Sequence, residues 1–222
     1  MIIIKFEKNN LKKNSTNLFP SKESVKLEDI AEILSGAMIV RNNRDKRNDK
    51  LKNQDNDYKY FPLKAVTKNN INLNHLEPLE SCKDYDKKYF AKKDDIIMKL
   101  TPPYEVAIFP EDVGENIVIS SKFAIIRVFD DEFLPIFLSY ILNSNKVKNQ
   151  IYRLVEGSFI SVLKIHYLKN LVIDKIEIEK QKKFAELLFL LNQRKEILIE
   201  KIKLENDLAE FIINNFITIE KR

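Results

Sequence analysis

Glycine, cysteine and histidine are scarce in this sequence. Its 222 residues contain only three glycines, whereas glycine usually makes up roughly 7% of a protein. Neither of the Gly-rich phosphate-binding motifs, GxGxxG and GxxxxGK[ST], occurs. One cysteine, Cys82, and two histidines, His75 and His166, are too few for a disulfide framework or a Cys/His zinc site. These absences argue against a nucleotide-binding fold and indicate a protein of a reducing compartment.

Long apolar runs are also missing. The first residues, MIIIKFEKNN, contain too short an apolar run for a signal peptide. The most apolar later stretch, Phe133 to Leu142, falls well short of the roughly 18 residues that a membrane helix needs. We therefore expect a soluble, cytoplasmic protein without a membrane partner. Hydrophobic residues make up 44% of the chain, which is enough to form the core of one large domain or two small ones.

The net charge is basic, but the residues that make it up reduce its value as evidence for a nucleic-acid partner. The net charge is +5 and the pI is near 9.0, and both favour a polyanionic partner. The 38 basic residues comprise 31 lysines and only seven arginines. A chain rich in Lys, Ile and Asn is also what an AT-rich genome encodes for any protein, so charge alone does not assign a nucleic-acid function.

The pattern of apolar residues predicts an α+β fold. Between Tyr58 and Val128 we expect a curled, mixed β-sheet, because short β-like runs alternate with turns; the runs are YKYFPL, DDIIMKL, YEVAIF, NIVIS and KFAIIRV. Packed helices are expected next, the first in FLPIFLSYIL with Asp130 and Asp131 before it as caps. Ser144 is expected to cap a second helix, which Gly157 ends.

The last segment predicts one long helix. No Gly or Pro occurs from Glu179 to Phe216, and a helix of that length would reach roughly 55 Å. Two adjoining apolar stripes make a face too broad for one neighbour, which indicates a coiled coil or bundle with another chain. The alternative is a helix that folds back on its own domain. The expected interface residues are Phe184, Leu187, Leu191, Leu198, Ile202 and Leu208.

These features divide the chain into three parts. Residues 1–24 are an N-terminal strand and a polar linker, residues 25–176 a globular domain, and residues 177–222 the long helix. Within the domain, residues 41–60 hold seven basic and four acidic residues and one aliphatic residue, so they form an exposed loop. This loop is either a solvated insertion or an arm whose Arg41, Arg44, Lys46 and Arg47 meet phosphates or bases.

No set of residues forms a recognisable catalytic site. His75 and His166 lie far apart in the sequence, and Cys82 has no evident histidine partner. Asp94 and Asp95 fit the start of a strand better than a metal site. Thr101-Pro102-Pro103-Tyr104 resembles part of an amino-methyltransferase motif, but Thr101 replaces the required Asn or Asp. We therefore expect no enzyme, no cofactor and no metal, and we expect a binding protein.

The order of several short motifs resembles one target-recognition module of the DNA-specificity subunits of type I restriction-modification enzymes. The opening motif is Leu27-Glu28-Asp29-Ile30 with Gly36, and the second is Asp94-Asp95-Ile96-Ile97. The others are Ile125-Ile126-Arg127, Tyr140-Ile141-Leu142-Asn143-Ser144, Gly157, Leu168, Leu171 and Gln181. Two positions depart from the family pattern: Lys93 or Asp94 replaces a Gly, and Asp174 or Lys175 replaces a Pro.

The resemblance implies sequence-specific binding of double-stranded DNA by a subunit without catalytic activity. Such a subunit positions a separate adenine methyltransferase subunit and, in a full complex, a restriction subunit, and these partners supply the S-adenosylmethionine, ATP and magnesium chemistry. Family members carry two recognition modules and two long helices that pair antiparallel. This chain has one of each, so the resemblance implies a half-length subunit that dimerises and reads a two-part inverted repeat.

The expected DNA contacts lie on polar loops between core elements. They are Arg41, Arg44, Arg47, Lys99, Thr101, Tyr104, Ser158 and Phe159. For each of them an ordinary solvated loop residue is the competing interpretation. For the whole chain, the competing hypothesis is a non-catalytic coiled-coil adaptor that binds no DNA.

Overall fold

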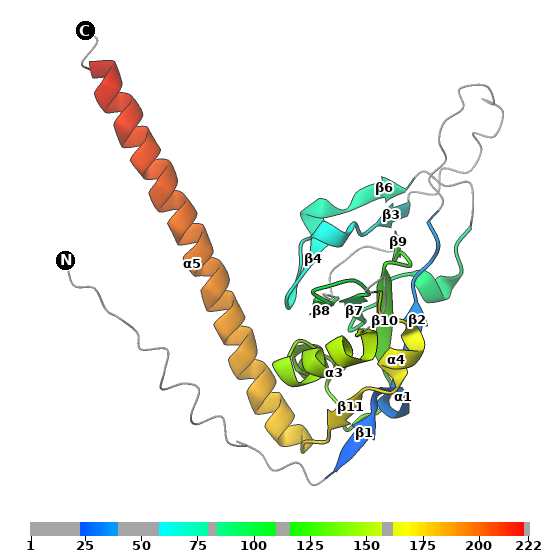
Figure 1. Cartoon of the computed structure of the whole chain (residues 1–222). Helices are drawn as coiled ribbons and strands as arrows, with labels where there is room; N and C mark the ends of the chain where they lie inside the picture. The colour runs from blue at the N-terminus through cyan, green and yellow to red at the C-terminus, as the bar shows by residue number, and fades with distance from the viewer. Residues whose placement is uncertain (1–22, 40–57, 80–83, 110–115, 157–161, 220–222) are drawn as a thin grey trace, which may run out of the picture. The chain divides into compact units, whose positions relative to one another are not determined.

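The computed structural model describes residues 23–39, 58–79, 84–109, 116–156 and 162–219 (Figure 1). By contacts the chain divides into two compact units, Met1–Ile178 and Glu179–Arg222. The first unit contains all of the described strands, which are β1 (Ser24–Lys26), β2 (Ala31–Ser35), β3 (Tyr58–Tyr60), β4 (Val66–Thr67), β5 (Asn70–Ile71), β6 (Glu77–Leu79), β7 (Ile96–Lys99), β8 (Val106–Ile108), β9 (Ile117–Val118), β10 (Phe123–Val128) and β11 (Val172–Asp174).

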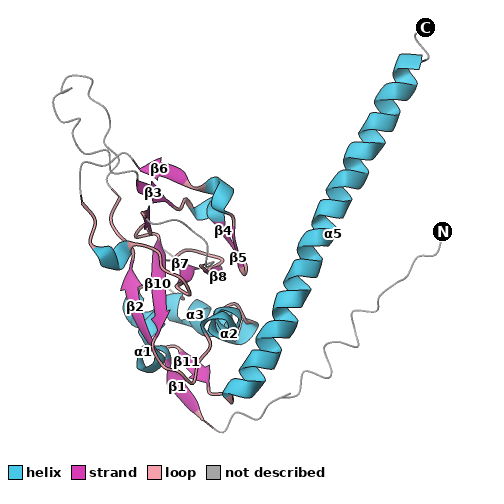
Figure 2. Ribbon diagram, turned by 180° about the vertical axis from the view of Figure 1, so that it is seen from behind, coloured by secondary structure: helices cyan, strands magenta, loops and turns pink. Residues whose placement is uncertain are grey.

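The helices follow the order that the sequence predicts. They are α1 (Leu27–Ile30), α2 (Pro135–Leu142), α3 (Asn145–Val155), α4 (Ile165–Lys169) and α5 (Ile178–Ile219). Short 3-10 turns cover Leu63–Ala65, Leu73–His75 and Lys87–Tyr89. The α+β class and the long C-terminal helix are confirmed. Figure 2 shows how the strands and helices of the first unit are arranged.

An antiparallel sheet with the order β2-β10-β7-β8 is the centre of the first unit. Its longest strand, β10, pairs with β2 on one side, where Ala124 lies opposite Ser35, and with β7 on the other, where Phe123 lies opposite Lys99. The other sheets are β6-β3-β9, β1-β11 and β4-β5. Within the first of these, β3 and β9 run parallel.

The central sheet is buried on both faces. Successive side chains of a strand point to opposite faces, and here both sets are apolar. Ala124 and Ile126 belong to one buried cluster together with α2, α3 and α4, whereas Phe123 and Ile125 belong to a second cluster with residues of the segment 61–76. This explains why the strands IIMK and FAIIRV are nearly continuous apolar runs rather than alternating ones.

The predicted helices are present, but some of their ends differ from expectation. Ser144 caps α3, because its side chain accepts a hydrogen bond from the Val147 amide. The caps expected at Asp130 and Asp131 are wrong: the residue before α2 is Leu134, and the Asp130 carboxylate accepts instead from the Glu132 amide at 2.8 Å. Pro135 occupies the first turn of α2, where its missing N–H costs nothing.

A close backbone crossing fixes the end of β2. The Ala37 amide donates to the Ile119 carbonyl at 2.7 Å, and the Ser121 amide donates to the Ala37 carbonyl, also at 2.7 Å. Gly36 lies inside this crossing, where a Cβ atom would stand 2.2 Å from the Ser120 carbonyl oxygen and 2.5 Å from that of Ile119. Only glycine fits there without displacing the backbone.

Helix α5 carries apolar side chains that its own chain leaves exposed. From Phe189 to Phe216 the side chains are exposed apart from the half-buried Asn192. The large exposed apolar ones include Leu190, Leu198 and Ile202. Among the described residues, no helix has the length and hydropathy that crossing a membrane requires.

We expect Gly36→Ala to lower the free energy of unfolding by roughly 2–4 kcal/mol, because the new Cβ would overlap two carbonyl groups of the 119–120 backbone. Urea unfolding followed by circular dichroism measures this change. Glu32→Ala, on an exposed position of β2, is the control and should cost under about 1 kcal/mol. Equal stability of Gly36→Ala and the native chain would contradict the packing argument.

Candidate nucleic-acid interface

The expected DNA contacts fall in three segments of the sequence, and described residues next to each segment lie at one end of the central sheet. The pairings of Ala124 with Ser35 and of Phe123 with Lys99 place the ends of β2 and β7 on either side of the start of β10. Residues 40–57 follow β2, and the turn 100–105 follows β7. The Leu100 amide donates to the Lys122 carbonyl at 3.0 Å, so that turn also lies beside the turn that precedes β10.

The third segment returns to the domain at the same place. The amide of Leu163, which follows residues 157–161, donates to the Leu100 carbonyl at 2.8 Å. Leu163, which follows residues 157–161, is therefore bonded to the turn 100–105, and the end of β2, which precedes residues 40–57, lies across β10 from that turn. No sequence pattern relates these segments to one another, because only the strand register and two backbone hydrogen bonds bring their flanks together.

The expected contact residues fall into two groups. Arg41, Arg44, Arg47, Ser158 and Phe159 lie outside the described residues. The other three, Lys99, Thr101 and Tyr104, lie within them, at the end of β7 and in the turn that follows. The surroundings of these three side chains decide whether they can reach a ligand.

Lys99 is engaged in an ion pair inside the domain. Its Nζ lies 2.6 Å from the Glu105 carboxylate, and the two side chains are only 12% and 25% exposed. The pair joins the end of β7 to the residue before β8 across the turn. A phosphate would have to compete with Glu105 for this ammonium group, so Lys99 offers little net positive charge to DNA.

Tyr104 is a core residue. Its side chain is fully buried, and its ring packs edge-on against Tyr152 with centroids 5.5 Å apart. Burial raises the pKa of its hydroxyl, with a smaller contribution from Tyr152. Its backbone has φ of 54°, an unusual value for a residue with a side chain. Thr101 is half-buried, and its carbonyl accepts from the Tyr104 amide at 2.9 Å. The ring of Tyr104 therefore supports the turn from inside.

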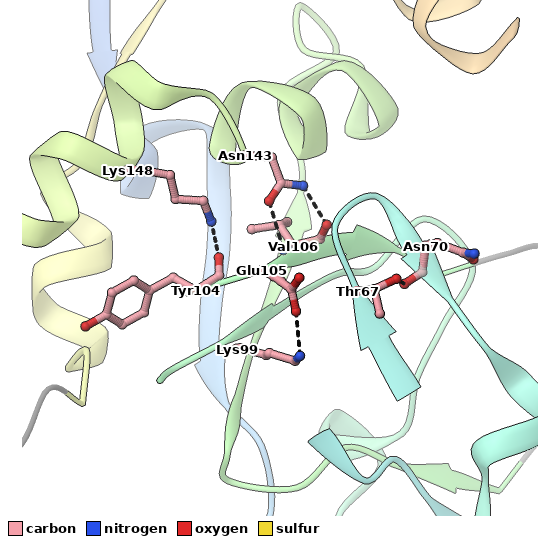
Figure 3. Close-up of polar contacts among 8 residues, drawn as sticks. All are labelled: Thr67, Asn70, Lys99, Tyr104, Glu105, Val106, Asn143 and Lys148. Atoms are coloured by element: carbon pink, nitrogen blue, oxygen red, sulfur yellow. Dashed lines mark hydrogen bonds and ion pairs between the residues drawn. The ribbon is translucent and has the colours of Figure 1, made fainter. Parts of the chain in front are cut away.

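Two side chains of the helical region hold the turn and the edge strand β8 (Figure 3). Asn143 Oδ1 accepts from the Val106 amide at 3.1 Å, and its Nδ2 donates to the Val106 carbonyl and to Asn69 Oδ1, each at 2.6 Å. Lys148 Nζ donates to the Tyr104 carbonyl. The side-chain amide of Asn143 thus satisfies the free edge of β8 and ties it to the turn between β4 and β5.

Asp95 has a structural role. Its carboxylate receives Arg127 Nε at 2.9 Å and Arg127 Nη2 at 3.1 Å, as well as the Lys92 amide at 2.9 Å. Arg127 also donates to the Phe90 carbonyl at 3.0 Å. Asp95 is 2% exposed, so this bidentate pair is a buried connection between β10 and the turn before β7. Two of the family motifs, around Asp95 and around Arg127, therefore meet in one contact.

Most of the exposed positive charge of the described domain comes from lysines, with Arg153 of α3 also exposed. Exposed lysines on or beside the small sheets and turns are Lys59, Lys64, Lys68, Lys87, Lys88, Lys92, Lys93 and Lys122. Several of them already have acidic neighbours, such as Lys88 with Asp86 at 3.1 Å. Among the described residues, no three His, Cys, Asp or Glu side chains gather as metal ligands would.

The sequence does not predict that Asn143, Lys148 and the Asp95–Arg127 pair support this region. Asn143 belongs to one of the motifs, but the sequence shows no partner for it, since Val106 and Asn69 lie 37 and 74 residues away. His166, which the sequence does not place in any site, lies in helix α4, is exposed, and contacts the Tyr167 ring with centroids 4.0 Å apart.

Solved structures share this fold. A chain from a structure on complex assembly and conformational transition of the type I R-M (restriction-modification) system aligns with a TM-score of 0.53 at 14% identity, over 84% of this chain and 42% of its own. The HsdS subunit from Thermoanaerobacter tengcongensis aligns over 82% of this chain and 40% of its own, with a TM-score of 0.49 and 17% identity.

The S subunit of a type I restriction-modification system from M. genitalium aligns with a TM-score of 0.49 and 18% identity, over 82% of this chain and 42% of its own. This chain thus spans less than half the length of each of the three. No protein-family model and no curated protein matches the sequence. The alignment with the first structure confirms the fold that the motif resemblance implied.

Removing one member of the Asp95–Arg127 pair should destabilise the domain strongly. We expect Asp95→Ala to cost about 3–5 kcal/mol, because it leaves the largely buried Arg127 guanidinium without its counter-ion. The double variant Asp95→Leu/Arg127→Met should recover part of this loss, since it removes both charges. Chemical unfolding measures the free energy of unfolding of the native chain, Asp95→Ala and the double variant, with Asp131→Ala at an exposed position as control. A loss under about 1 kcal/mol for Asp95→Ala would contradict a structural role.

Lys148 should make stability depend on alkaline pH. Burial lowers its pKa from 10.5 to about 8, against a smaller opposing effect of Glu105. The folded chain therefore bears a penalty for the charged form below pH 8, and that penalty disappears as the pH rises from about 8 to 10.5. We expect the native chain to gain stability relative to Lys148→Met over this range in unfolding titrations. Lys146→Met, at an exposed position of the same helix, should show no such relative gain.

Proposed function

We propose that this chain is a DNA-recognition subunit that positions a separate adenine methyltransferase subunit, and a restriction subunit where present, on a two-part target. In this proposal the first unit reads one half of the target and α5 joins two copies of the chain. The copies supply two recognition domains in a symmetric arrangement, so the target is an inverted repeat.

The placement of the described residues beside three polar segments carries the proposal: the end of β2 and the turn 100–105 lie on either side of the start of β10, and Leu163 is bonded to that turn. A rigid, doubly buried sheet from which several polar segments leave at one end is suited to reading base edges, because the scaffold fixes where each segment starts and ends. In the sequence, Arg41, Arg44 and Arg47 come after β2, which ends at Ser35, and Ser158 and Phe159 precede Leu163. The fold shared with a chain of a type I restriction-modification system adds independent support.

The internal ion pairs reduce the number of residues that we assign to DNA contact. Lys99 is paired with Glu105 and Arg127 with Asp95, so both support the scaffold. Tyr104 supports it through packing. We therefore assign DNA contact to Arg41, Arg44, Arg47, Ser158 and Phe159 and give Thr101 a place at the edge of the interface. Arginine suits this role because its guanidinium makes bidentate contacts to guanine or to phosphate.

A coiled-coil adaptor without DNA binding is the second candidate. The observation that favours it is the broad apolar face of α5, which is wider than a pair of helices requires. The same broad face also fits the proposed specificity subunit, because a methyltransferase partner would cover the part of the face that a second copy of α5 leaves exposed. DNA binding separates the two candidates.

The proposal is tested by co-expression with an adenine methyltransferase subunit that co-purifies with the chain, followed by single-molecule sequencing for methylated adenines. We expect a bipartite inverted-repeat motif that disappears without this chain. A soluble, associated pair that methylates no such motif would rule out the specificity function and leave the adaptor.

The triple variant Arg41→Gln/Arg44→Gln/Arg47→Gln tests the arm itself. Each base-contacting arginine contributes about 1–3 kcal/mol, so we expect affinity for the recovered target to fall at least roughly tenfold, on the order of a single such contact. The charge-matched control is Lys26→Gln/Lys146→Gln/Lys175→Gln. These lysines lie at the opposite end of the sheet, near β1 and β11, and make only surface ion pairs. Fluorescence anisotropy at fixed salt compares the two variants.

A further inference from the structure

Helix α5 contains a regular heptad seam. From Phe184 to Phe216, ten positions follow one another at alternating steps of four and three residues. Eight of the ten are apolar, and the two charged positions are Lys195 and Glu205. The full seam is Phe184, Leu188, Leu191, Lys195, Leu198, Ile202, Glu205, Ala209, Ile212 and Phe216. Such spacing keeps one stripe of a helix facing a single partner helix.

The seam is symmetric about Glu200. Each apolar position on one side of Glu200 has an apolar position at the same distance on the other side, and Lys195 has Glu205. The symmetric pairs are Phe184 with Phe216, Leu188 with Ile212, Leu191 with Ala209, Lys195 with Glu205, and Leu198 with Ile202. A sequence with this symmetry is complementary to a second copy of itself in the opposite direction.

Other pairings of the same seam are worse. A parallel pair in register would set Lys195 against Lys195 and Glu205 against Glu205. An antiparallel pair shifted by one heptad would set each charge against an apolar side chain and would lose contacts at the ends. Burying a charge without a partner costs far more than a mismatch of apolar shapes, so the charged pair selects both direction and register.

A neighbouring stripe lacks this symmetry. It consists of Leu187, Leu190, Arg194, Ile197, Lys201, Leu204, Leu208 and Phe211, and both of its charged residues are cations. Two copies of this stripe would bring no anion to Arg194 or Lys201. This contrast singles out the first stripe as the self-pairing one and leaves Leu187 and Leu208, also expected at the interface, beside it.

We propose that Lys195 of each copy forms an ion pair with Glu205 of the partner subunit and that this pair sets the register in which two antiparallel copies meet along the seam. The inference rests on the self-association in the proposed function and specifies its geometry. In the single chain, the seam residues from Leu191 to Phe216 are exposed. Glu205 lies 3.7 Å from Lys201 on its own helix, but such an exposed contact is weak and does not prevent Glu205 from pairing across the dimer.

Cysteine cross-linking tests the register in the full-length chain with Cys82→Ser. Leu191→Cys chains are mixed with Ala209→Cys chains, oxidised and separated on a denaturing gel. We expect a heterodimeric disulfide from this mixture. Leu191→Cys mixed with Ile202→Cys, which matches the shifted register, and Leu191→Cys alone, which reports a parallel pair, should cross-link little. A stronger product from either of these two samples would overturn the proposed register.

Charge exchange tests the ion pair by sedimentation. Lys195→Glu or Glu205→Lys alone places like charges opposite each other twice in every dimer, and we expect the dissociation constant to rise at least roughly tenfold. The double variant Lys195→Glu/Glu205→Lys should return it toward the native value. Lys203→Glu and Glu210→Lys are the matched controls, because they make the same charge changes at positions outside both apolar stripes of α5. A double variant as weak as the single ones would overturn the ion pair.

These measurements need no DNA, so they can reject the proposed dimer without rejecting the proposed DNA recognition. A native chain that sediments as a monomer, alone or with its methyltransferase partner, would overturn the self-pairing. Methylation of a bipartite motif by that same preparation would still support the recognition function. Conversely, a dimer with the proposed register that directs no methylation would support the seam and reject the proposed function.

Discussion

Burial of strand β10 on both faces is the constraint on which the first unit depends. Its alternate side chains enter two separate apolar clusters, one shared with the helices and one shared with the segment 61–76. Because it pairs with β2 on one side and β7 on the other, it also decides which chain ends lie together. The described part of the candidate DNA interface follows from that pairing, because the end of β2, the turn after β7 and Leu163 lie near the start of β10.

Several polar side chains of the domain bind one another or the backbone of the domain, and these contacts stabilise the scaffold. Asp95 and Arg127 fasten β10 to the turn before β7, Asn143 satisfies the edge of β8, and Lys99 closes its turn with Glu105. Because these charged side chains are paired within the domain, they offer little of their charge to DNA phosphates. Affinity for DNA would then come from residues outside the scaffold, of which the arginines after β2 are the clearest example.

Helix α5 poses a different physical problem. Its apolar surface exceeds what a single chain covers, and its two stripes differ in charge pattern: one is self-complementary and the other carries two cations. A symmetric pair through the first stripe would place the second stripe at its edge, available to a different protein. Dimer formation and partner binding would thus use separate surfaces of one helix, so that one need not disturb the other.

The sequence by itself determined the α+β class, the strands β3, β7, β8, β9 and β10, helices α2 and α3, and the long α5, because periodicity and capping act over short distances along the chain. It misplaced the cap of α2 and did not predict β4, β5 and β6, where neighbouring elements override or supply the local pattern. Only the tertiary structure decided that Tyr104 is buried, that Lys99 is paired, and that Asn143 binds Val106. These depend on contacts between residues far apart in the chain, which strand register fixes and local spacing does not encode.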